Sequence, residues 1–321
     1  MNIVRSVRNK LPRIAIAMGD PAGIGPEVIL KSLKHIKKFC KPLIICDKKF
    51  LKKIADKLNI KLNDKDILDL ENINFKVRIG RINKLAGKVS AEYIKKAVEL
   101  ALKNEVKAIV TAPINKESLK KDKIDFPGQT EMLAKLTNTR NFAMMLIGDF
   151  LRVVLVTTHV SIKDVSKLIN KNNIYEKIKL TSIWLKEYFK IKKPVMAVAG
   201  LNPHSGENGL FGNEEVEKII PAIKKARRNL KVKIVGPVPP DALFYKAKKE
   251  KYDAIVCMYH DQGLIPLKMI AFEKGVNITL GLPIIRTSPD HGTAYDIAGK
   301  GIANPNSFME AVKLAAFLAK G

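Results

Sequence analysis

The chain has 321 residues, of which 46% are hydrophobic and 28% charged, the composition of a globular protein with one large domain or two smaller ones. No apolar run approaches the roughly 18 to 20 residues that cross a bilayer, so no membrane partner is expected. Three cysteines without CxxC spacing support neither a disulfide framework nor a zinc ribbon. The apolar segment IAIAM near the N-terminus is too short for a signal peptide, and we therefore expect a cytoplasmic enzyme.

The net charge of +27 raises nucleic-acid binding as an alternative function. The basic residues, however, alternate with Leu, Ile and Ala at helical spacing, as in KSLKHIKKFCK and AIKKARRNL, which is typical of solvated helix faces. Aromatic residues make up only 6%, and neither a stacking platform nor a zinc finger is visible. A lysine-rich surface without a nucleic-acid partner is the favoured interpretation, and its field would attract anionic substrates.

Apolar runs rich in Val and Ile recur along the chain and alternate with helical patterns. The predicted strands span residues 13–18, 42–46, 107–112, 152–158, 195–200, 232–236, 254–259 and 276–281. The predicted helices span residues 26–39, 90–104, 213–230 and 307–320. This alternation predicts an α/β protein with a mostly parallel sheet and right-handed crossovers. If there are two domains, the chain crosses between them within DFPGQTE (125–131) and again after GLIPLK (263–268).

Two glycine-containing segments stand at places where a phosphate or a nucleotide could bind. GDPAGIGPE (19–27) follows the first predicted strand and opens a helix, but it is not GxGxxG. A tight strand-to-helix turn with Pro26 at the helix start explains it equally well. RTSPDHGTAYDIAGKGIANP (286–305) could wrap a nucleotide or could be a simple loop.

Three of the five histidines, His159, His204 and His260, follow the ends of separate predicted strands. Ligands of open α/β sheets bind beyond the carboxyl ends of the strands, so one edge of the sheet would gather these side chains. A lone histidine there is more often a turn residue or a general base. Three imidazoles suit Zn²⁺ or a similar divalent cation with one open coordination position, which is the pattern of a catalytic site.

Seven sequence blocks, taken together, resemble those of the 4-hydroxythreonine-4-phosphate dehydrogenase family of pyridoxal phosphate biosynthesis. They are GDPAGIGPE, TAPINK, FPGQTE, TTHVS, GLNPHSGENGLFGNEE, MYHDQGLIPLK and VNITLGLPIIRTSPDHGTAYDIAG. The blocks run from residue 19 to about residue 300 in the family's order. GIGPE and HGTAYDIAGKGIANP also resemble the wider isocitrate and isopropylmalate dehydrogenase fold.

The resemblance implies two α/β/α domains with mostly parallel sheets and an active-site cleft between them. Residues 1–127 with 270–321 would form the domain that carries the termini and the nucleotide loop. Residues 128–269 would form the second domain, with the metal histidines and the dimer contacts. In the family the active sites are shared within a homodimer, and the third metal-binding histidine, at the position of His260, comes from the partner subunit.

The resemblance also assigns site residues. His159, His204 and His260 fall on the metal ligands, for Zn²⁺ or possibly Mg²⁺ or Co²⁺. The substrate-binding positions are Gln129, Thr130, Lys268, Asn277 and Arg286. Gln129 stands where the family usually has His. Lys268 and Asp261 are both candidates for the general base, and His291, Gly292 and Asp296 fall in the loop that holds the adenosine of NAD or NADP.

The implied reaction is NAD(P)-dependent oxidation of 4-phosphooxy-L-threonine to a 3-keto acid, which loses CO₂ to give 3-amino-2-oxopropyl phosphate in pyridoxine 5′-phosphate biosynthesis. A relative of the same family that oxidises 4-phosphorylated erythronate or threonate is the alternative. Only the group on C2 separates these substrates, and the sequence does not identify its contact.

Overall fold

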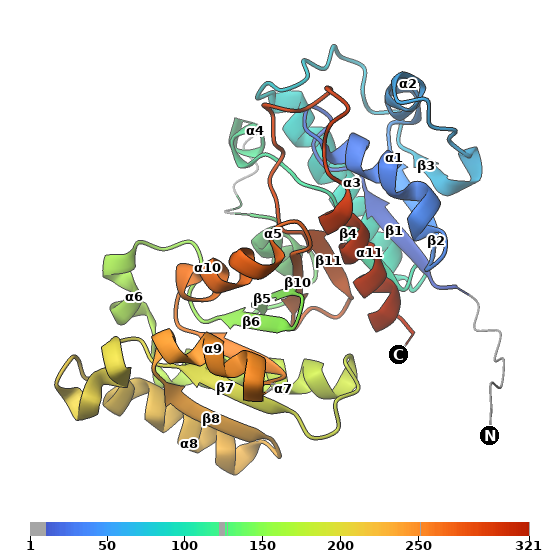
Figure 1. Ribbon diagram of the computed structural model, residues 1–321. Helices are drawn as coiled ribbons and strands as arrows, with labels where there is room; N and C mark the ends of the chain where they lie inside the picture. Colours follow the sequence, from blue (N-terminus) through green and yellow to red (C-terminus); the bar gives the residue numbers. More distant parts are fainter. Residues whose placement is uncertain (1–10, 122–125, 127, 251, 321) are drawn as a thin grey trace, which may run out of the picture.

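A single mixed sheet runs through the computed structural model, which describes residues 11–121, 126, 128–250 and 252–320 (Figure 1). Its strands, named in the order in which they lie side by side, are β3 (Ile67–Asp69), β2 (Lys41–Cys46), β1 (Arg13–Ala17), β4 (Ala108–Thr111), β11 (Arg286–Pro289), β10 (Val276–Leu280), β5 (Ala143–Gly148), β6 (Leu151–Leu155), β9 (Ala254–Cys257), β7 (Val195–Ala199) and β8 (Lys233–Val238).

Helices cover the sheet. They are α1 (Gly25–Ile36), α2 (Lys48–Lys57), α3 (Lys84–Leu102), α4 (Lys116–Lys121), α5 (Gln129–Leu136), α6 (Ile162–Leu168), α7 (Lys171–Glu187), α8 (Ile220–Asn229), α9 (Pro240–Glu250), α10 (His260–Ala271) and α11 (Asn306–Leu318), with short helical turns η1 (Asp64–Asp66), η2 (Pro203–Gly209) and η3 (Glu215–Ile219). Helix α1 has Pro26 in its first turn, as the sequence predicted. No helix in the described part of the chain has the length and apolarity needed to span a bilayer.

All eight predicted strands are present, because their Val- and Ile-rich sequences suit a sheet that is buried on both faces. Three further strands, β3, β5 and β11, were not predicted. The sequence of β5, AMMLIG, is rich in Met and poor in β-branched residues, and that of β11, RTSP, is polar and ends in proline. Both are stabilised by pairing with β10 rather than by their own propensity.

The prediction of a mostly parallel sheet is confirmed, and the antiparallel pairings lie in the middle of the sheet. Strands β3, β2, β1, β4 and β11 pair in parallel, and so do β6, β9, β7 and β8. Between these two blocks, β10 pairs antiparallel with β11 and β5, and β5 pairs antiparallel with β6. The two parallel blocks therefore run in opposite directions.

The hydrophobic core follows the same division. One cluster surrounds the first block and includes residues of α1, α3 and α11, whereas two clusters lie on the faces of the second block. Figure 1 shows the blue, cyan and red elements around the first block and the green, yellow and orange elements around the second. Met132 and Leu133 of α5 pack in the first cluster. The division into residues 1–127 with 270–321 and residues 128–269 stays a proposal, and its boundary residue Pro127 lies outside the described residues.

Close packing of α3 on α4 gives a test of the fold. A Cβ added at Gly87 would lie 2.3 Å from the carbonyl oxygen of Ser118. Alanine normally stabilises a helix interior relative to glycine by about 1 kcal/mol. We expect Gly87→Ala instead to destabilise the protein by about 1–3 kcal/mol, because the two helices must move apart.

Urea unfolding measures this change. Gly263→Ala on α10 is the matched control, because its Cβ would meet side-chain atoms of Leu155, Cys257 and Val153 at 3.1, 3.2 and 3.4 Å and no backbone atom. This substitution should therefore destabilise the protein less. A Gly87→Ala protein as stable as the wild type would show that α3 and α4 are not packed this closely.

Candidate active site

A cavity of about 370 Å³ lies over the middle of the sheet, where β4, β11, β10 and β5 are neighbours. Helices α4, α5 and α10 contribute residues to its wall. Most of the lining side chains are polar or charged, and they are Thr111, Lys116, Gln129, Thr130, Glu131, His159, His260, Lys268, Asn277, Arg286, Ser288, Asp290 and His291. The cavity is therefore suited to a small, strongly polar ligand.

The register of β10 explains why side chains from three strands meet there. Asn277 pairs with Ser288 of β11 on one side and with Leu146 of β5 on the other. Residues directly opposite each other in a sheet point to the same face, and all three line the cavity. The antiparallel strand thus brings side chains that are far apart in the sequence to one place.

Arg286 is the most deeply buried charged group in this wall, with 2% of its surface exposed. Its Nε and Nη2 donate to Thr111 Oγ1 at 3.1 and 2.9 Å, its Nη1 donates to Thr279 Oγ1 at 3.2 Å, and its Nη2 also donates to Gln129 Oε1. All these acceptors are neutral. Burial lowers the pKa of Arg286 to about 9, against the attraction of Glu131, so the guanidinium is charged at neutral pH. An anionic ligand would stabilise it.

Gln129, predicted to contact substrate, lies in the cavity and also holds this arginine. Its Oε1 accepts from Arg286 and from Thr111 Oγ1, the latter at 2.5 Å, and its Nε2 donates to the Ala112 carbonyl at 3.0 Å. Arginine has no acceptor atoms, which fixes the orientation of the amide. Thr130 is buried beside it in the first turn of α5, whose free backbone N–H groups favour an anion.

The structure brings two of the three predicted metal-binding histidines together. His159 follows β6 and His260 begins α10, and their ring centroids are 5.9 Å apart. The predicted strand 254–259 ends at Cys257, so His260 belongs to a helix rather than to a strand end. Burial, and then the nearby charge of Lys116, lowers the pKa of His159 and favours the neutral imidazole that binds metals.

The third histidine, His204, does not line this cavity. It lies in η2, beyond the end of β7 at Ala199, where six successive residues have positive φ angles. Its side chain is 63% exposed, and its Nδ1 lies 2.6 Å from Glu207 Oε1, a contact that raises the pKa of His204. In the part of the chain that the structure describes, no group of three or more His, Cys, Asp or Glu side chains could hold a metal ion.

The histidines nevertheless have the chemistry of metal ligands. His260 Nδ1 lies 2.6 Å from Asp261 Oδ1, as His204 Nδ1 does from Glu207. A carboxylate on one ring nitrogen orients an imidazole for metal binding through the other. With ring centroids 5.9 Å apart, His159 and His260 could both bind one cation, so the cavity fits two positions of a divalent metal site.

The two candidates for the general base are placed differently. Lys268 lines the cavity, and its Nζ lies 3.4 Å from Asp290 Oδ2. Burial raises the pKa of Asp290, while the charge of Lys268 acts in the opposite direction. The side chain of Asp261 is 68% exposed and does not line this cavity; its Oδ1 lies 2.6 Å from His260 Nδ1.

Among the described residues, three buried polar atoms of the wall have no hydrogen-bond partner, which is uncommon in folded proteins and suits contacts with a ligand. They are Asn277 Oδ1, Glu131 Oε2 and His291 Nε2. Nothing lies within 4 Å of a Cβ added at Gly292, so a ligand could approach the backbone there. Asp296, the third residue predicted to bind the cofactor, is exposed and lies outside this wall.

Several residues of the wall were not predicted from the sequence, among them Lys116, Glu131, Ser288 and Asp290. Three of them had a usable signal: Lys116 closes the TAPINK block just after a predicted strand, Glu131 closes the FPGQTE block, and Asp290 directly precedes His291. The place of Ser288 in the wall follows only from the pairing of β11 with β10.

Comparison with known proteins agrees with this arrangement. The family model described as pyridoxal phosphate biosynthetic protein PdxA matches residues 38–315. The chain is 46% identical, over 96% of its length and 96% of the other, to a 4-hydroxythreonine-4-phosphate dehydrogenase of Desulforapulum autotrophicum. It is 44% identical, over 97% of its length and 99% of the other, to a protein of Oceanobacillus iheyensis provisionally named D-threonate 4-phosphate dehydrogenase.

Solved structures extend the comparison to the fold. The crystal structure of a 4-hydroxythreonine-4-phosphate dehydrogenase from Klebsiella pneumoniae matches with a TM-score of 0.85 and 38% identity, covering 98% of this chain and 100% of that one. A β-decarboxylating dehydrogenase from Thermococcus kodakarensis matches with a TM-score of 0.50 and 16% identity, covering 95% and 82%, which shows a shared fold alone.

The fold is isocitrate/isopropylmalate dehydrogenase-like, as the sequence predicted, and the family match identifies the chain as a dehydrogenase. The chain belongs to the PdxA family. Membership implies NAD(P) as the hydride acceptor and a phosphorylated small molecule as the substrate.

The contact between Gln129 and Arg286 gives a test of the anion site. Gln129→Leu removes the acceptor at nearly constant size, and the unfolding free energy should fall by about 1–3 kcal/mol because a buried charge loses a partner. Gln129→Glu keeps the acceptor but adds a negative charge beside Arg286. It should keep most of the stability and weaken the binding of inorganic phosphate.

Denaturant unfolding and calorimetric titration with inorganic phosphate measure the two effects separately. If the Gln129→Glu protein binds phosphate as tightly as the wild type, Arg286 is not the anion-binding group.

Proposed function

We propose that this protein oxidises 4-phosphooxy-L-threonine at C3, transferring a hydride to NAD(P)⁺, in pyridoxine 5′-phosphate biosynthesis. The C3 hydroxyl loses its proton to a base and its carbon loses a hydride, which gives a 3-keto acid. This acid then loses its carboxylate as CO₂, and protonation of the remaining enolate gives 3-amino-2-oxopropyl phosphate. The buried, unpaired cation Arg286, in one cavity with two histidines and Lys268, is the observation that carries the proposal.

The residues of the cavity suit these roles. Arg286 and the first turn of α5 would bind an anionic group of the substrate. Lys268 is the one of the two base candidates that lines the cavity, and we assign it the role of general base. His159 and His260 would hold a divalent cation such as Zn²⁺, Mg²⁺ or Co²⁺, which when bound supplies Lewis-acid polarisation of the substrate oxygens.

The loop that begins at His291 suits the cofactor. His291 Nε2 is buried without a partner, and the backbone at Gly292 is open to a ligand. The exposed carboxylate of Asp296, further along the loop, can accept hydrogen bonds from ribose hydroxyls. These groups support binding of NAD or NADP without distinguishing between the two.

Glu131 favours a substrate with an amino group on C2 over a phosphorylated threonate or erythronate. Its Oε2 lies buried in the cavity wall without a hydrogen-bond donor, and so does Asn277 Oδ1. A substrate ammonium carries three donors and a positive charge, whereas the hydroxyl of an aldonate offers one neutral donor. The aldonates are the alternative substrates, as one relative's provisional name suggests.

Assays with NAD⁺ or NADP⁺ and each phosphorylated acid test this choice. Glu131→Gln should lower kcat/KM for 4-phosphooxy-L-threonine by about tenfold or more, since a charge-assisted hydrogen bond contributes about 1.5–3 kcal/mol. Its effect on threonate 4-phosphate should be several times smaller. A wild-type protein that oxidises threonate 4-phosphate faster would instead assign the aldonate activity.

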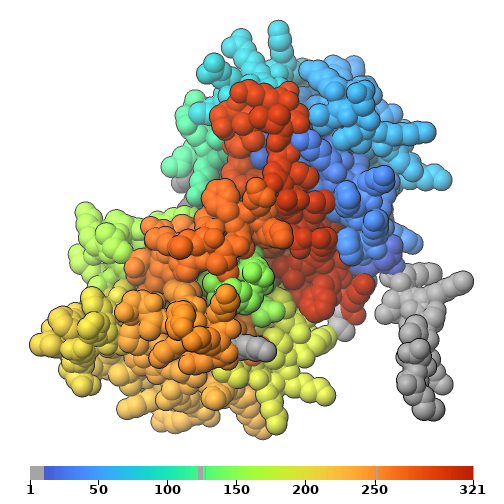
Figure 2. All heavy atoms as spheres, in the orientation of Figure 1, coloured from blue at the N-terminus to red at the C-terminus, as the bar shows by residue number. Residues whose placement is uncertain are grey.

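We further propose a homodimer in which His204 of one subunit, rather than His260 as the resemblance implied, completes the metal site of the other, because His159 and His260 line one cavity of the same chain. Exposed apolar side chains follow each of the three histidines in sequence, and they are Val160, Ile162, Leu210, Phe211, Ile265, Met269 and Phe272. Met269 and Phe272 on α10 are 81% and 73% exposed, and Figure 2 shows this orange segment at the surface. Apolar groups gathered in this way mark an interface, and a second copy would bring the third histidine.

Mixing inactive subunits tests whether the metal site is shared between two subunits. Hybrids of His159→Ala with His204→Ala contain one intact site, so random pairing should restore about a quarter of the wild-type activity and metal content. Hybrids of His159→Ala with His260→Ala should restore none, because both residues belong to the same chain's half of the site. The opposite pattern would exclude His204 as the partner's ligand.

A further inference from the structure

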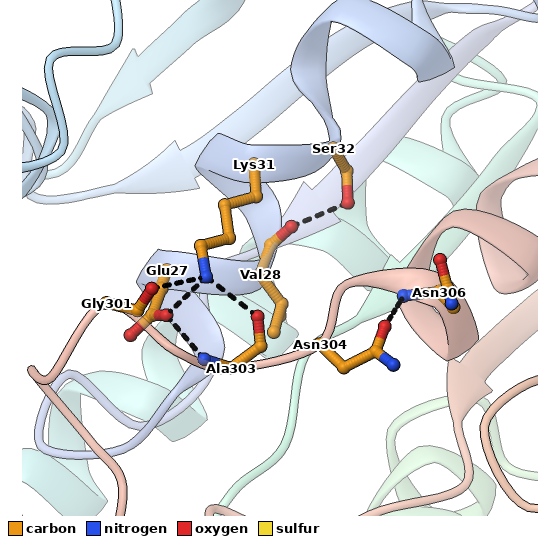
Figure 3. A network of polar contacts seen from close by, with 8 residues as sticks. All are labelled: Glu27, Val28, Lys31, Ser32, Gly301, Ala303, Asn304 and Asn306. Carbon is orange, nitrogen blue, oxygen red and sulfur yellow. Dashed lines mark hydrogen bonds and ion pairs between the residues drawn. The ribbon is translucent and has the colours of Figure 1, made fainter.

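The glycine-containing loop (286–305) is bound to α1 near its C-terminal end by Glu27 and Lys31 (Figure 3). In this ion pair Glu27 is buried and Lys31 is partly buried. Lys31 Nζ donates to the carbonyl oxygens of Gly301 and Ala303, at 2.7 and 2.9 Å, and lies 2.9 Å from Glu27 Oε1. The same Glu27 oxygen accepts from the Ala303 backbone N–H at 2.7 Å. The two side chains thus bind three backbone groups of one short segment.

This pair differs from the ordinary i,i+4 ion pairs of the protein. Lys103–Glu99 on α3 has both side chains substantially exposed, and pairs of that kind contribute little to stability. Glu27, in contrast, is buried, and its partner is only partly exposed. A buried ion pair is weak support for stability in itself, because desolvation offsets its attraction. Its specific effect here is to fix where the loop backbone lies.

The N-terminal half of the loop forms hydrogen bonds with the same region of the chain, residues 20–31. Ile24 N–H donates to the Thr293 carbonyl at 3.0 Å, and the Tyr295 hydroxyl donates to Asp20 Oδ2 at 2.6 Å. Residues 20–31 therefore hold the loop at both ends. The first residues of the loop line the active-site cavity, whereas neither member of the Glu–Lys pair does.

We propose that Glu27 and Lys31 are positioning residues that set the affinity for the nicotinamide cofactor, an inference that rests on the proposed function. Backbone hydrogen bonds from Ile297 to Ala294 and from Lys300 to Ile297, both 3.2 Å, set the internal turns of the loop, and the contacts of its two ends with residues 20–31 fix where it lies. A binding loop that is already ordered costs less free energy to occupy. Releasing its C-terminal end lowers cofactor affinity and leaves the substrate-binding wall unchanged.

The test is direct titration of the wild type and of Lys31→Met with NAD⁺ and NADP⁺, without substrate, by calorimetry or protein fluorescence. The Kd of the preferred cofactor should rise about tenfold or more, the factor that corresponds to about 1.4 kcal/mol. Lys31→Arg and Glu27→Gln keep part of the hydrogen bonding, so their Kd values for the cofactor should lie between those of the wild type and Lys31→Met. In turnover assays, kcat at saturating cofactor and KM for the phosphorylated substrate should stay within about twofold of the wild type.

Lys313→Met is the matched control, because it removes a lysine from a more exposed ion pair with Glu310 on the helix that follows the same loop. It should bind the cofactor as the wild type does. Equal affinity of the Lys31→Met and wild-type proteins, or an equal loss of affinity for the phosphorylated substrate, overturns the inference. If Lys31→Met does not fold, the Lys31→Arg and Glu27→Gln titrations decide in the same way. A wild-type protein that binds neither nicotinamide cofactor overturns the proposed function instead.

Discussion

The antiparallel pairing of β10 with β11 and β5 is the constraint on which the rest of the structure depends. It joins the two parallel blocks into one sheet, and it places Asn277 opposite Ser288 and Leu146. Side chains alternate between the faces of a strand, so a shift of β10 by one residue would turn Asn277 to the opposite face of the sheet from Ser288 and Leu146. The backbone register of β10 therefore determines where the cavity lies, and the side chains then determine its chemistry.

The cavity concentrates charge in a way that the surface does not. The excess of basic residues is spread over solvated helices, where it contributes mainly to a long-range field. Arg286, in contrast, is buried among hydroxyls and an amide that keep it oriented without neutralising it. A carboxylate partner would make the folded protein more stable and the site less able to bind an anion. The arrangement favours binding over stability.

Much of this could be predicted from the sequence, because strand-forming runs are local and ligands gather where strands end. The eight apolar strands, the mostly parallel sheet and the approach of His159 to His260 belong to this class. Strands β5 and β11 could not be predicted, because they form through pairing with β10 rather than through their own strand propensity. The contact of Gln129 with Arg286 joins residues 157 apart, and the displacement of His204 depends on left-handed backbone angles that follow no simple sequence pattern.

The order of the strands has a consequence for how the protein is made. Strands β10 and β11 lie in the middle of the sheet but come from the last part of the chain. Until the ribosome has released residues 276–289, β4 and β5 are open edges, with unpaired backbone groups that can join a strand of another chain. While these edges are open, they make the nascent chain prone to aggregation. The strands that remove this hazard are also those that complete the active site.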